Sequence, residues 1–415
     1  MRYPYNLNSD STFLTSVFCF LRQHGVDYKV PLHINIHYNF GFMLGFAFIS
    51  QILTGLFLAM HYVPTTELAF ISVELITRDV NHGWLIRNLH SNGASLIFFC
   101  MYLHMFRGVY YMVSKDVWLS GFIIFLLTMA TAFLGYVLPW GQMSFWGATV
   151  ICNLFGAIPF IGPDIVYCLW GGSVIANNTL YRFYVLHFFL PLITLALSGF
   201  HMGLLHDKGS RAPMILPEEY SKTSLFPYFF LKDLVFFYMI GIGFIFLVFF
   251  YPNFLNHADN FIQANSFSTP THIQPEWYFL PFFCILRCIP SKDQGIFWMT
   301  AFILLNFCLD AYPEFKRLEK EILDEVNLNE LNRSTFFFNE LSLPISFGLL
   351  FLMGFFGMQV QESPYDEISS FICMSTFLLT NHNLIEFYEN VFTHRNLRLI
   401  KEKESTNILF STLKN

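Results

Sequence analysis

The sequence predicts an all-α integral membrane protein with eight transmembrane helices. Of its 415 residues, 54% are hydrophobic and only 13% are charged, which is too apolar for a soluble protein of this length. The apolar residues also gather into spans of about 20 residues, and a helix of that length crosses a membrane while satisfying its own backbone hydrogen bonds. The net charge of −6 predicts no nucleic-acid partner.

Eight apolar spans follow one another along the chain. They cover residues 39–60, 84–113, 117–138, 180–206, 234–251, 294–312, 341–360 and 367–392. The last is the weakest, because polar residues 380–383 interrupt it. An even number of spans puts both termini on one side, and that side holds 18 of the 23 lysines and arginines. This asymmetry defines the inner side and places the long connections 139–179 and 252–293 on the outer side.

Four histidines lie inside these spans in two equally spaced pairs. His90 and His104 are 14 residues apart, and so are His187 and His201. Fourteen helical residues rise ~21 Å and end about 40° short of four full turns, so each helix carries two imidazoles on nearly one face. Two such helices facing each other would hold two stacked six-coordinate haems. Polar histidines that only bond neighbouring helices would not need the same spacing twice.

Glycines at the same interval extend the pattern to two more spans. Gly41 and Gly55 lie in the first span, and Gly121 and Gly135 lie in the third. Membrane glycines often only permit close helix packing. The shared interval indicates instead that each glycine leaves room for a flat macrocycle edge. We therefore expect the first four spans to form a bundle around two stacked haems.

Arginines stand close to the histidines in the sequence. Arg87, Arg107 and Arg182 lie three to five residues from a histidine of the pairs. Arginine binds carboxylates in a bidentate manner, so haem propionates are candidate partners. The alternative is that these side chains only extend to the membrane surface. Arg87 and Arg182 lie on the arginine-poor outer side, which favours a specific anionic partner.

Several motifs occur in a fixed order between about residues 30 and 390. They are RNLHSNGASLIFF, YLHMFRG, GYVLPWGQMSFWGATV, RFYVLHFFLP, HMGLLHDKGS, PEWYFLP and GMQVQESPY. In this order they resemble the cytochrome b family, the haem-bearing subunits of ubiquinol–cytochrome c reductases. LPWGQMSFWGAT and PEWY are the most specific of them.

The resemblance implies a role for each histidine of the pairs. His90 and His187 correspond to the axial ligands of a low-potential haem b on the outer side, and His104 and His201 to those of a high-potential haem b on the inner side. Two axial histidines leave no open position for dioxygen, which suits electron transfer. Arg87 and Arg182 would meet the propionates of the outer haem and Arg107 those of the inner haem. Trp118 is a further neighbour of the inner haem.

The resemblance also implies an outer site for ubiquinol oxidation. Its signature is Pro275-Glu276-Trp277-Tyr278, in which Glu276 would accept a proton from quinol. We expect the apolar surroundings to raise the pKa of that carboxyl. Other residues expected to line the pocket or to take part in the chemistry are Phe133, Tyr136, Gly147, Ile151 and Tyr278. Phe283 stands where the family usually has a tyrosine, so a hydroxyl group is missing here.

An inner quinone-reducing site is implied near the second haem. His206 and Asp233 would deliver protons to reduced quinone, and Ser210 and Lys232 belong to the same set. Asn39 would border this pocket. Taken alone, His206 fits equally well as an interfacial surface histidine.

The prediction for the whole chain is the central electron-transfer subunit of a proton-translocating quinol–cytochrome c oxidoreductase. Residues 1–215 would form the di-haem bundle with the inner site and part of the outer site, and residues 216–415 a four-span domain with the PEWY loop. A Rieske-type iron–sulfur subunit, a cytochrome c1-type subunit, a second copy of the chain and the lipid bilayer are expected partners. The resemblance, helped by the lack of a cleavable signal, implies the mitochondrial inner membrane.

Other readings of the chain remain open. A transporter or channel could place the same side chains in its spans, but it would show no Soret absorption. A di-haem b anchor of another quinone-linked dehydrogenase would share the histidine pairs and lack PEWY. The photosynthetic relatives divide the chain after four spans and separate their second pair by 15 residues. The continuous chain and the spacing of 14 residues here favour the respiratory form.

Two further expectations concern segments outside these motifs. The eight cysteines show no CxxC pattern, so all are expected to be buried, reduced packing residues. The charged stretch 313–340 is expected to be a solvated loop, with an amphipathic helix as the alternative.

Overall fold

The structure is a computed structural model. It describes residues 22–111, 113–210, 222–308 and 333–378, together with Thr15, Phe18 and Cys19. The chain divides into two compact units, one formed by residues 1–152 and 165–270 and the other by residues 153–164 and 271–415.

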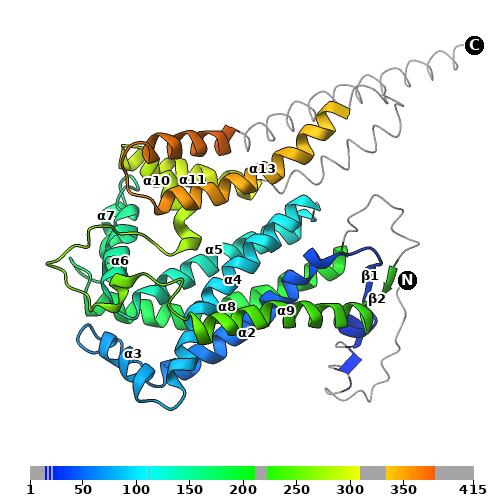
Figure 1. The fold of residues 1–415 in the computed structure, drawn as a ribbon, viewed down its shortest axis with the longest axis horizontal. Helices are drawn as coiled ribbons and strands as arrows, with labels where there is room; N and C mark the ends of the chain where they lie inside the picture. Colours follow the sequence, from blue (N-terminus) through cyan, green and yellow to red (C-terminus); the bar gives the residue numbers. More distant parts are fainter. Residues whose placement is uncertain are drawn as a thin grey trace, which may run out of the picture. The chain divides into compact units, whose positions relative to one another are not determined.

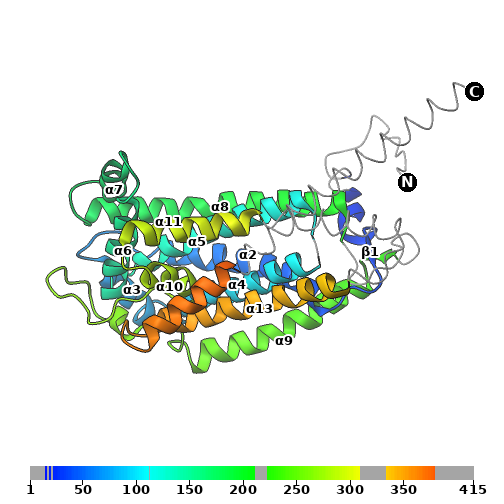
Figure 2. The same ribbon diagram turned by 90° about the horizontal axis from the view of Figure 1, so that it is seen from above.

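Five long helices form the framework of the first unit. They are α2 (Phe40–Ala59), α4 (Gly83–Tyr110), α5 (Lys115–Val137), α8 (Asn177–Lys208) and α9 (Tyr228–Phe250). α2 packs against α4, α5 packs against α8, and α9 contacts both α4 and α2. These helices run side by side in Figures 1 and 2. The packing pairs each predicted glycine-bearing span with a histidine-bearing one.

Four helices of this unit are long and apolar enough to cross a membrane. They are Ile36–Ala59, which adds the turn before α2, together with α5, α8 and α9. α4 has 28 residues, which is length enough, but it carries the buried polar residues Asn88, Asn92 and Ser95. The outer surfaces of these helices expose many leucine, isoleucine and phenylalanine side chains, as lipid-facing helices do. The predicted class, an all-α integral membrane protein, is confirmed.

Shorter elements also belong to the first unit, apart from residues 153–164, which belong to the second. The helices α3 (Ala69–Arg78), α6 (Gln142–Phe155) and α7 (Gly162–Trp170) lie in connections where we expected no full span. The backbone N–H of Gln142 donates to the carbonyl of Ile262 at 2.9 Å, so the two long outer connections are joined. Trp140, Ala148, Cys152 and Phe183 belong to the apolar cluster beneath them.

The described residues also contain one small antiparallel sheet and an isolated β-bridge between Gly141 and Gln263. The sheet pairs β1 (Lys29–Pro31) with β2 (Lys222–Ser224), in the register Val30 opposite Thr223. The Lys29 ammonium donates to the Ser224 hydroxyl at 2.7 Å. The sheet ties the chain before α2 to the chain before α9.

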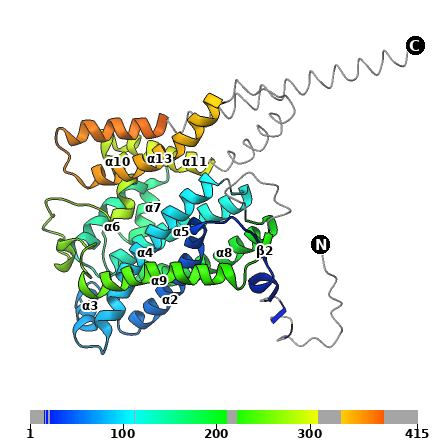
Figure 3. The ribbon, with the colours of Figure 1, turned by 45° about the vertical axis from the view of Figure 1, so that its right-hand side comes forward.

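The second unit is a smaller helical assembly. It contains the short 3-10 helix η4 (Trp277–Phe279), α10 (Leu280–Cys288), α11 (Lys292–Cys308), α13 (Arg333–Met358) and a helical stretch over residues 365–378. α10 packs against both α11 and α13, as Figure 3 shows. A buried cluster that includes Cys284, Ile285, Phe302, Met353 and Ile372 forms its core.

The eight predicted spans coincide with helices of the two units, although the sixth and the last continue beyond the described residues. α13 begins at Arg333, eight residues before its predicted span. Residues 309–332 hold most of the charged stretch 313–340 and lie outside the described residues, so its loop or helix character stays a prediction. α9 belongs to the same compact unit as the first four spans. The predicted functional domains, residues 1–215 and 216–415, stay a prediction.

The expectation that every cysteine is buried is wrong. Cys19 and Cys168 are exposed, whereas Cys100, Cys152 and Cys284 are buried. Cysteine behaves as a small apolar residue, and at the two exposed positions no packing demand selects it.

Candidate functional site

Two histidine pairs face each other across the bundle of the first unit. The ring centres of His90 and His187 are 6.2 Å apart, with the ring planes at 89°. Those of His104 and His201 are 6.3 Å apart, with the planes at 60°. α4 supplies one ring of each pair and α8 the other, and the 14-residue spacing puts the pairs at two levels of the bundle. The structure thus brings together the residues that the sequence pairs.

The separation of the rings fits an iron atom between them. With metal–nitrogen bonds of ~2 Å, an ion bound to one nitrogen of each ring requires ring centres separated by about 6 Å. Both pairs have this separation. Direct ring stacking would require a shorter distance, and a structural hydrogen bond would not need it twice.

The Nδ1 atoms of three of these histidines are held by neighbouring oxygen atoms. His187 Nδ1 lies 2.8 Å from the Thr131 carbonyl oxygen, and because a carbonyl only accepts, the ring donates there. The Thr54 hydroxyl lies 3.0 Å from His90 Nδ1, and the Ser120 hydroxyl lies 2.8 Å from His201 Nδ1. Such contacts fix the ring orientation and leave Nε2 available to a metal.

The four predicted glycines abut the four histidine rings, one to each. A Cβ at Gly41 would lie 3.2 Å from His104 Cε1, and one at Gly55 would lie 3.0 Å from His90 Cε1. On α5, a Cβ at Gly121 would lie 2.9 Å from His201 Cε1, and one at Gly135 would overlap the ring of His187. The missing side chains therefore leave room at the levels where the histidine pairs lie.

A cavity of about 310 Å³ opens at the outer pair. His90 and His187 line it, and so do Gly55, Gly135 and Arg87. Its wall is mostly apolar, with residues such as Ile52, Leu56, Ile76, Leu138 and Leu192. An apolar cavity with two converging imidazoles and an arginine at its edge suits a flat, largely apolar ligand with anionic substituents.

Buried polar atoms without partners mark the surroundings of the inner pair. Among the described residues, Arg107 Nε and Trp118 Nε1 are buried N–H donors with no hydrogen-bond acceptor. Leaving such donors unpaired costs about 1–3 kcal/mol each, so an acceptor belongs beside them. A haem propionate would supply one, which agrees with the predicted roles of Arg107 and Trp118.

One contact at the inner pair conflicts with metal binding in this side-chain arrangement. Arg107 Nη2 lies 3.1 Å from His104 Nδ1. A guanidinium only donates, so this contact leaves the proton of His104 on Nε2. Binding iron through Nε2 therefore requires Arg107 to turn away from the ring, and an anionic propionate is the group that would draw it.

The two outer arginines differ in their surroundings. Arg87 lines the outer cavity and lies over the Phe261 ring at 5.8 Å. Arg182 is exposed, does not line this cavity, and donates to the main-chain carbonyl of Cys168. Arg87 is thus placed beside the outer pair, whereas the propionate role of Arg182 stays a prediction.

The residues predicted for the inner quinone site fall into two groups. In the first, Asn39 Nδ2 donates to the Asp233 carboxylate at 2.8 Å, and the Lys232 ammonium donates to the Ile34 carbonyl at 2.8 Å. Asn39 is buried, and it holds Asp233 at the start of α9. The β1–β2 pairing and these two bonds bring the chain before α2 onto α9.

The second group surrounds His206 and contains two residues that the sequence reasoning missed. Tyr28 stacks on His206 with ring centres 4.0 Å apart, and His24 Nδ1 lies 2.9 Å from His206 Nδ1. Burial raises the pKa of Tyr28, and a hydrogen bond with Ser210 opposes that rise. No pattern in the sequence marks these contacts, because three-residue strands create them.

The residues predicted for the outer quinol site are divided between the units. In the first unit, Phe133 packs on Phe183 with ring centres 5.7 Å apart, and the Ser144 hydroxyl donates to the Tyr136 carbonyl at 2.6 Å. A Cβ at Gly147 would meet no described atom within 4 Å, so the α6 backbone is open there, one turn before Ile151.

In the second unit, Pro275 and Glu276 lead into the short helix η4. Glu276 is the N-cap residue of η4 but makes no side-chain cap bond to it, so the role of a helix cap does not explain this carboxylate. Tyr278 is buried. The Arg287 guanidinium lies over the Phe283 ring at 5.3 Å, where the resemblance implied a tyrosine. The shared site of the two groups stays a prediction.

Comparison with known proteins identifies the family. The model described as "Cytochrome b/b6/petB" matches residues 25–209, and "Cytochrome b(C-terminal)/b6/petD" matches residues 263–378. Cytochrome b of Arabidopsis thaliana is 45% identical over 374 residues, covering 87% of this chain and 90% of the relative. That of Phytophthora megasperma is 51% identical over 294 residues, covering 70% and 77%.

A solved structure agrees with the sequence relatives. A chain of a "Hyperthermophilic respiratory Complex III" matches with a TM-score of 0.79 and 29% identity, over 90% of this chain and 96% of that one. The histidine pairs and the glycines that abut them all lie within residues 25–209, the region matched by the first family model. The chain belongs to the cytochrome b family.

Proposed function

We propose that this chain is the electron-transfer subunit of a ubiquinol–cytochrome c reductase and binds two b-type haems. His90 and His187 would hold the outer, low-potential haem, and His104 and His201 the inner, high-potential one. The observation that carries this proposal is the equal separation of the two ring pairs, 6.2 and 6.3 Å. When bound, the haems supply one-electron redox chemistry at two levels of the membrane.

Glu276 is the proton acceptor of the outer site in this proposal. Quinol oxidation releases two protons, and a carboxylate next to the quinol can accept one of them and pass it on to water. The Glu276 side chain makes no cap hydrogen bond to η4. Phe133, Tyr136, Gly147 and Ile151 of the first unit, and Pro275, Tyr278 and Phe283 of the second, would shape the quinol pocket. The aromatic face of Phe283 offers packing without a hydroxyl, so no hydrogen bond to quinol comes from this position.

The inner site would return protons to quinone from the opposite side. Asp233 is held by Asn39, and His206 is held by the stacked ring of Tyr28, so both proton-bearing groups are positioned by neighbours. Lys232 and Ser210 accompany them. Proton release outside and uptake inside, with an electron moved ~21 Å between the two levels, would convert redox energy into charge displacement across the membrane.

The redox chemistry requires partners, because the chain offers no iron–sulfur ligand set of the CxxC type. A Rieske-type iron–sulfur subunit and a cytochrome c1-type subunit would receive the other electron of each quinol. The family resemblance also supports our proposal that the complex is a homodimer in the mitochondrial inner membrane.

Substituting valine for Gly55 tests whether the first four spans leave room for a haem at the level of His90. A side chain there must enter the space beside the His90 ring, where even a Cβ would lie 3.0 Å from Cε1. We expect the b-haem content per chain of the purified complex to fall from two towards one, measured by reduced-minus-oxidised difference spectra.

Gly45→Val on the same helix is the matched control. Gly45 is exposed, and a Cβ there would meet no described atom within 4 Å. The haem content of the Gly45→Val variant should therefore equal that of the unmodified protein. Full haem content in Gly55→Val would contradict the placement of a macrocycle at this level.

A further inference from the structure

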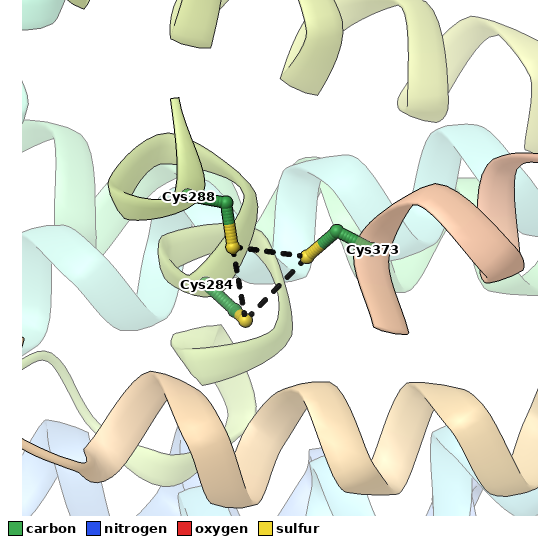
Figure 4. A group of neighbouring side chains, drawn as sticks. All are labelled: Cys284, Cys288 and Cys373. Atoms are coloured by element: carbon green, nitrogen blue, oxygen red, sulfur yellow. Dashed lines mark hydrogen bonds between the residues drawn. The ribbon is translucent and has the colours of Figure 1, made fainter. Parts of the chain in front are cut away.

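Three cysteines of the second unit turn their sulfur atoms toward one point. Cys284 and Cys288 are four residues apart on α10, so they share one face of that helix. Cys373 comes from the helical stretch 365–378, 85 residues further along the chain. The Sγ–Sγ distances are 3.8 Å for Cys284–Cys288, 3.5 Å for Cys284–Cys373 and 3.3 Å for Cys288–Cys373. Figure 4 shows the resulting triangle of sulfur atoms.

The surroundings of the trio are apolar. Cys284 is 1% exposed and lies in the core cluster with Phe302, Met353 and Ile372. Cysteine often serves only as a small apolar packing residue, and that role explains its burial here. It does not explain why three sulfur atoms from two segments meet one another instead of packing on carbon.

The geometry points to a metal site: we propose that Cys284, Cys288 and Cys373 bind one thiophilic ion with a filled d shell, of the Zn(II) or Cu(I) class. Three atoms with the observed separations lie on a circle with a radius of about 2 Å, and an ion slightly above its centre reaches each sulfur at the ~2.3 Å typical of metal–thiolate bonds. Soft thiolates select these ions over magnesium or calcium.

The charge balance of the site is favourable. Three S–H protons leave to solvent as three metal–sulfur bonds form, so Zn(II) gives a site with one negative charge and Cu(I) a site with two. Arg287 lies in the same turn of α10, and its guanidinium is fixed by donation to the carbonyls of Gly357 and Gln359 at 3.0 and 2.8 Å. This positive charge offsets the negative site in an apolar environment.

The two ions differ in the ligands they require. Zn(II) in structural sites takes four ligands. The Ser369 hydroxyl, 3.4 Å from Cys288 Sγ, is placed to supply the fourth. Cu(I) would be satisfied by the three sulfur atoms. Either ion would join α10 to the helical stretch 365–378, and so act as a cross-link within the second unit.

The test uses the purified complex, both as isolated and after chelator treatment followed by one equivalent of Zn(II) or, under reducing conditions, Cu(I). We expect one ion per chain, with an X-ray absorption spectrum that shows three sulfur neighbours at ~2.3 Å. The zinc and copper absorption edges distinguish the two ions. Cys373→Ser should lose this equivalent, whereas Cys152→Ser, which alters a buried cysteine outside the trio, should retain it.

A second measurement needs no variant, so it still tests the proposal if Cys373→Ser does not assemble. In the unmodified complex, the bound ion should protect Cys288 and Cys373 from maleimide, and removal of the ion should expose them, as read by peptide mass spectrometry. The proposal is overturned if neither ion binds in the isolated or reconstituted complex. It is also overturned if binding lacks sulfur neighbours, or if two of these cysteines are found as a disulfide.

Discussion

Replacing His187 with alanine is expected to remove the outer haem and to leave the inner one in place. The substitution deletes one of the two proposed axial nitrogens of the outer pair, while His104 and His201 keep their separation of 6.3 Å at the other level. The haem content should fall from two to one per chain in difference spectra. Ubiquinol–cytochrome c reductase turnover should drop at least ~100-fold, because loss of a ligand costs more than loss of its supporting contacts.

His61→Ala is the control for this variant. His61 is an exposed histidine beyond the end of α2, so both haems and the turnover should remain. A His187→Ala complex that keeps two haems with unchanged spectra would show that His187 is not an axial ligand. If both haems are lost, an assay of complex assembly will show whether the variant has misfolded or has folded without its haems.

Glu276→Gln is expected to slow quinol oxidation at the outer site at least about tenfold, since a positioned acid–base group contributes 10²–10⁴-fold. The amide keeps the size of the side chain but cannot take up the quinol proton. The measurement compares pre-steady-state reduction of the b-haems through the outer site with their reduction by quinol through the inner site. Only the outer rate should fall.

Glu362→Gln is the matched change for this experiment. Glu362 is an exposed carboxylate of the same unit, and its removal should alter neither rate. Equal slowing at both sites in Glu276→Gln would indicate a general effect on the fold. Unchanged rates at both would remove Glu276 from the proton path.

The histidine and glycine intervals of the sequence predicted the geometry of the bundle because a helix converts sequence spacing into position directly. His90 and His104 must lie on one face of α4, and Gly55 and Gly41 must lie at the same levels of α2 if the helices are in contact. The structure pairs α2 with α4 and α5 with α8, and each glycine meets one histidine ring. The relative positions of residues within such helices can be predicted without knowing how the loops run.

Contacts made by short irregular segments could not be predicted in this way. Tyr28 and His24 reach His206 because two three-residue strands pair across a long stretch of chain, with Lys29 opposite Ser224, 195 positions away. Three residues carry too little pattern to signal a strand. The cysteine trio depends on how the stretch 365–378 packs on α10, and Arg182 depends on the path of the chain near Cys168. Sequence spacing does not encode either arrangement.

The two haem sites should differ in potential for a reason visible in the structure. Arg107 lies beside the inner pair, and after its guanidinium turns from His104 Nδ1 towards a propionate, its positive charge would still favour the reduced iron there. The outer pair lies in a mostly apolar cavity with Arg87 at its edge. The inner haem is therefore the one expected to accept electrons more readily.

A redox titration of the visible spectrum of the purified complex tests the central claim most directly. Two histidine pairs of equal separation and unequal surroundings predict two b-type α-bands per chain, which titrate with clearly separated midpoints. A single b-type band with one haem per chain, or a complex without Soret absorption, would contradict the account.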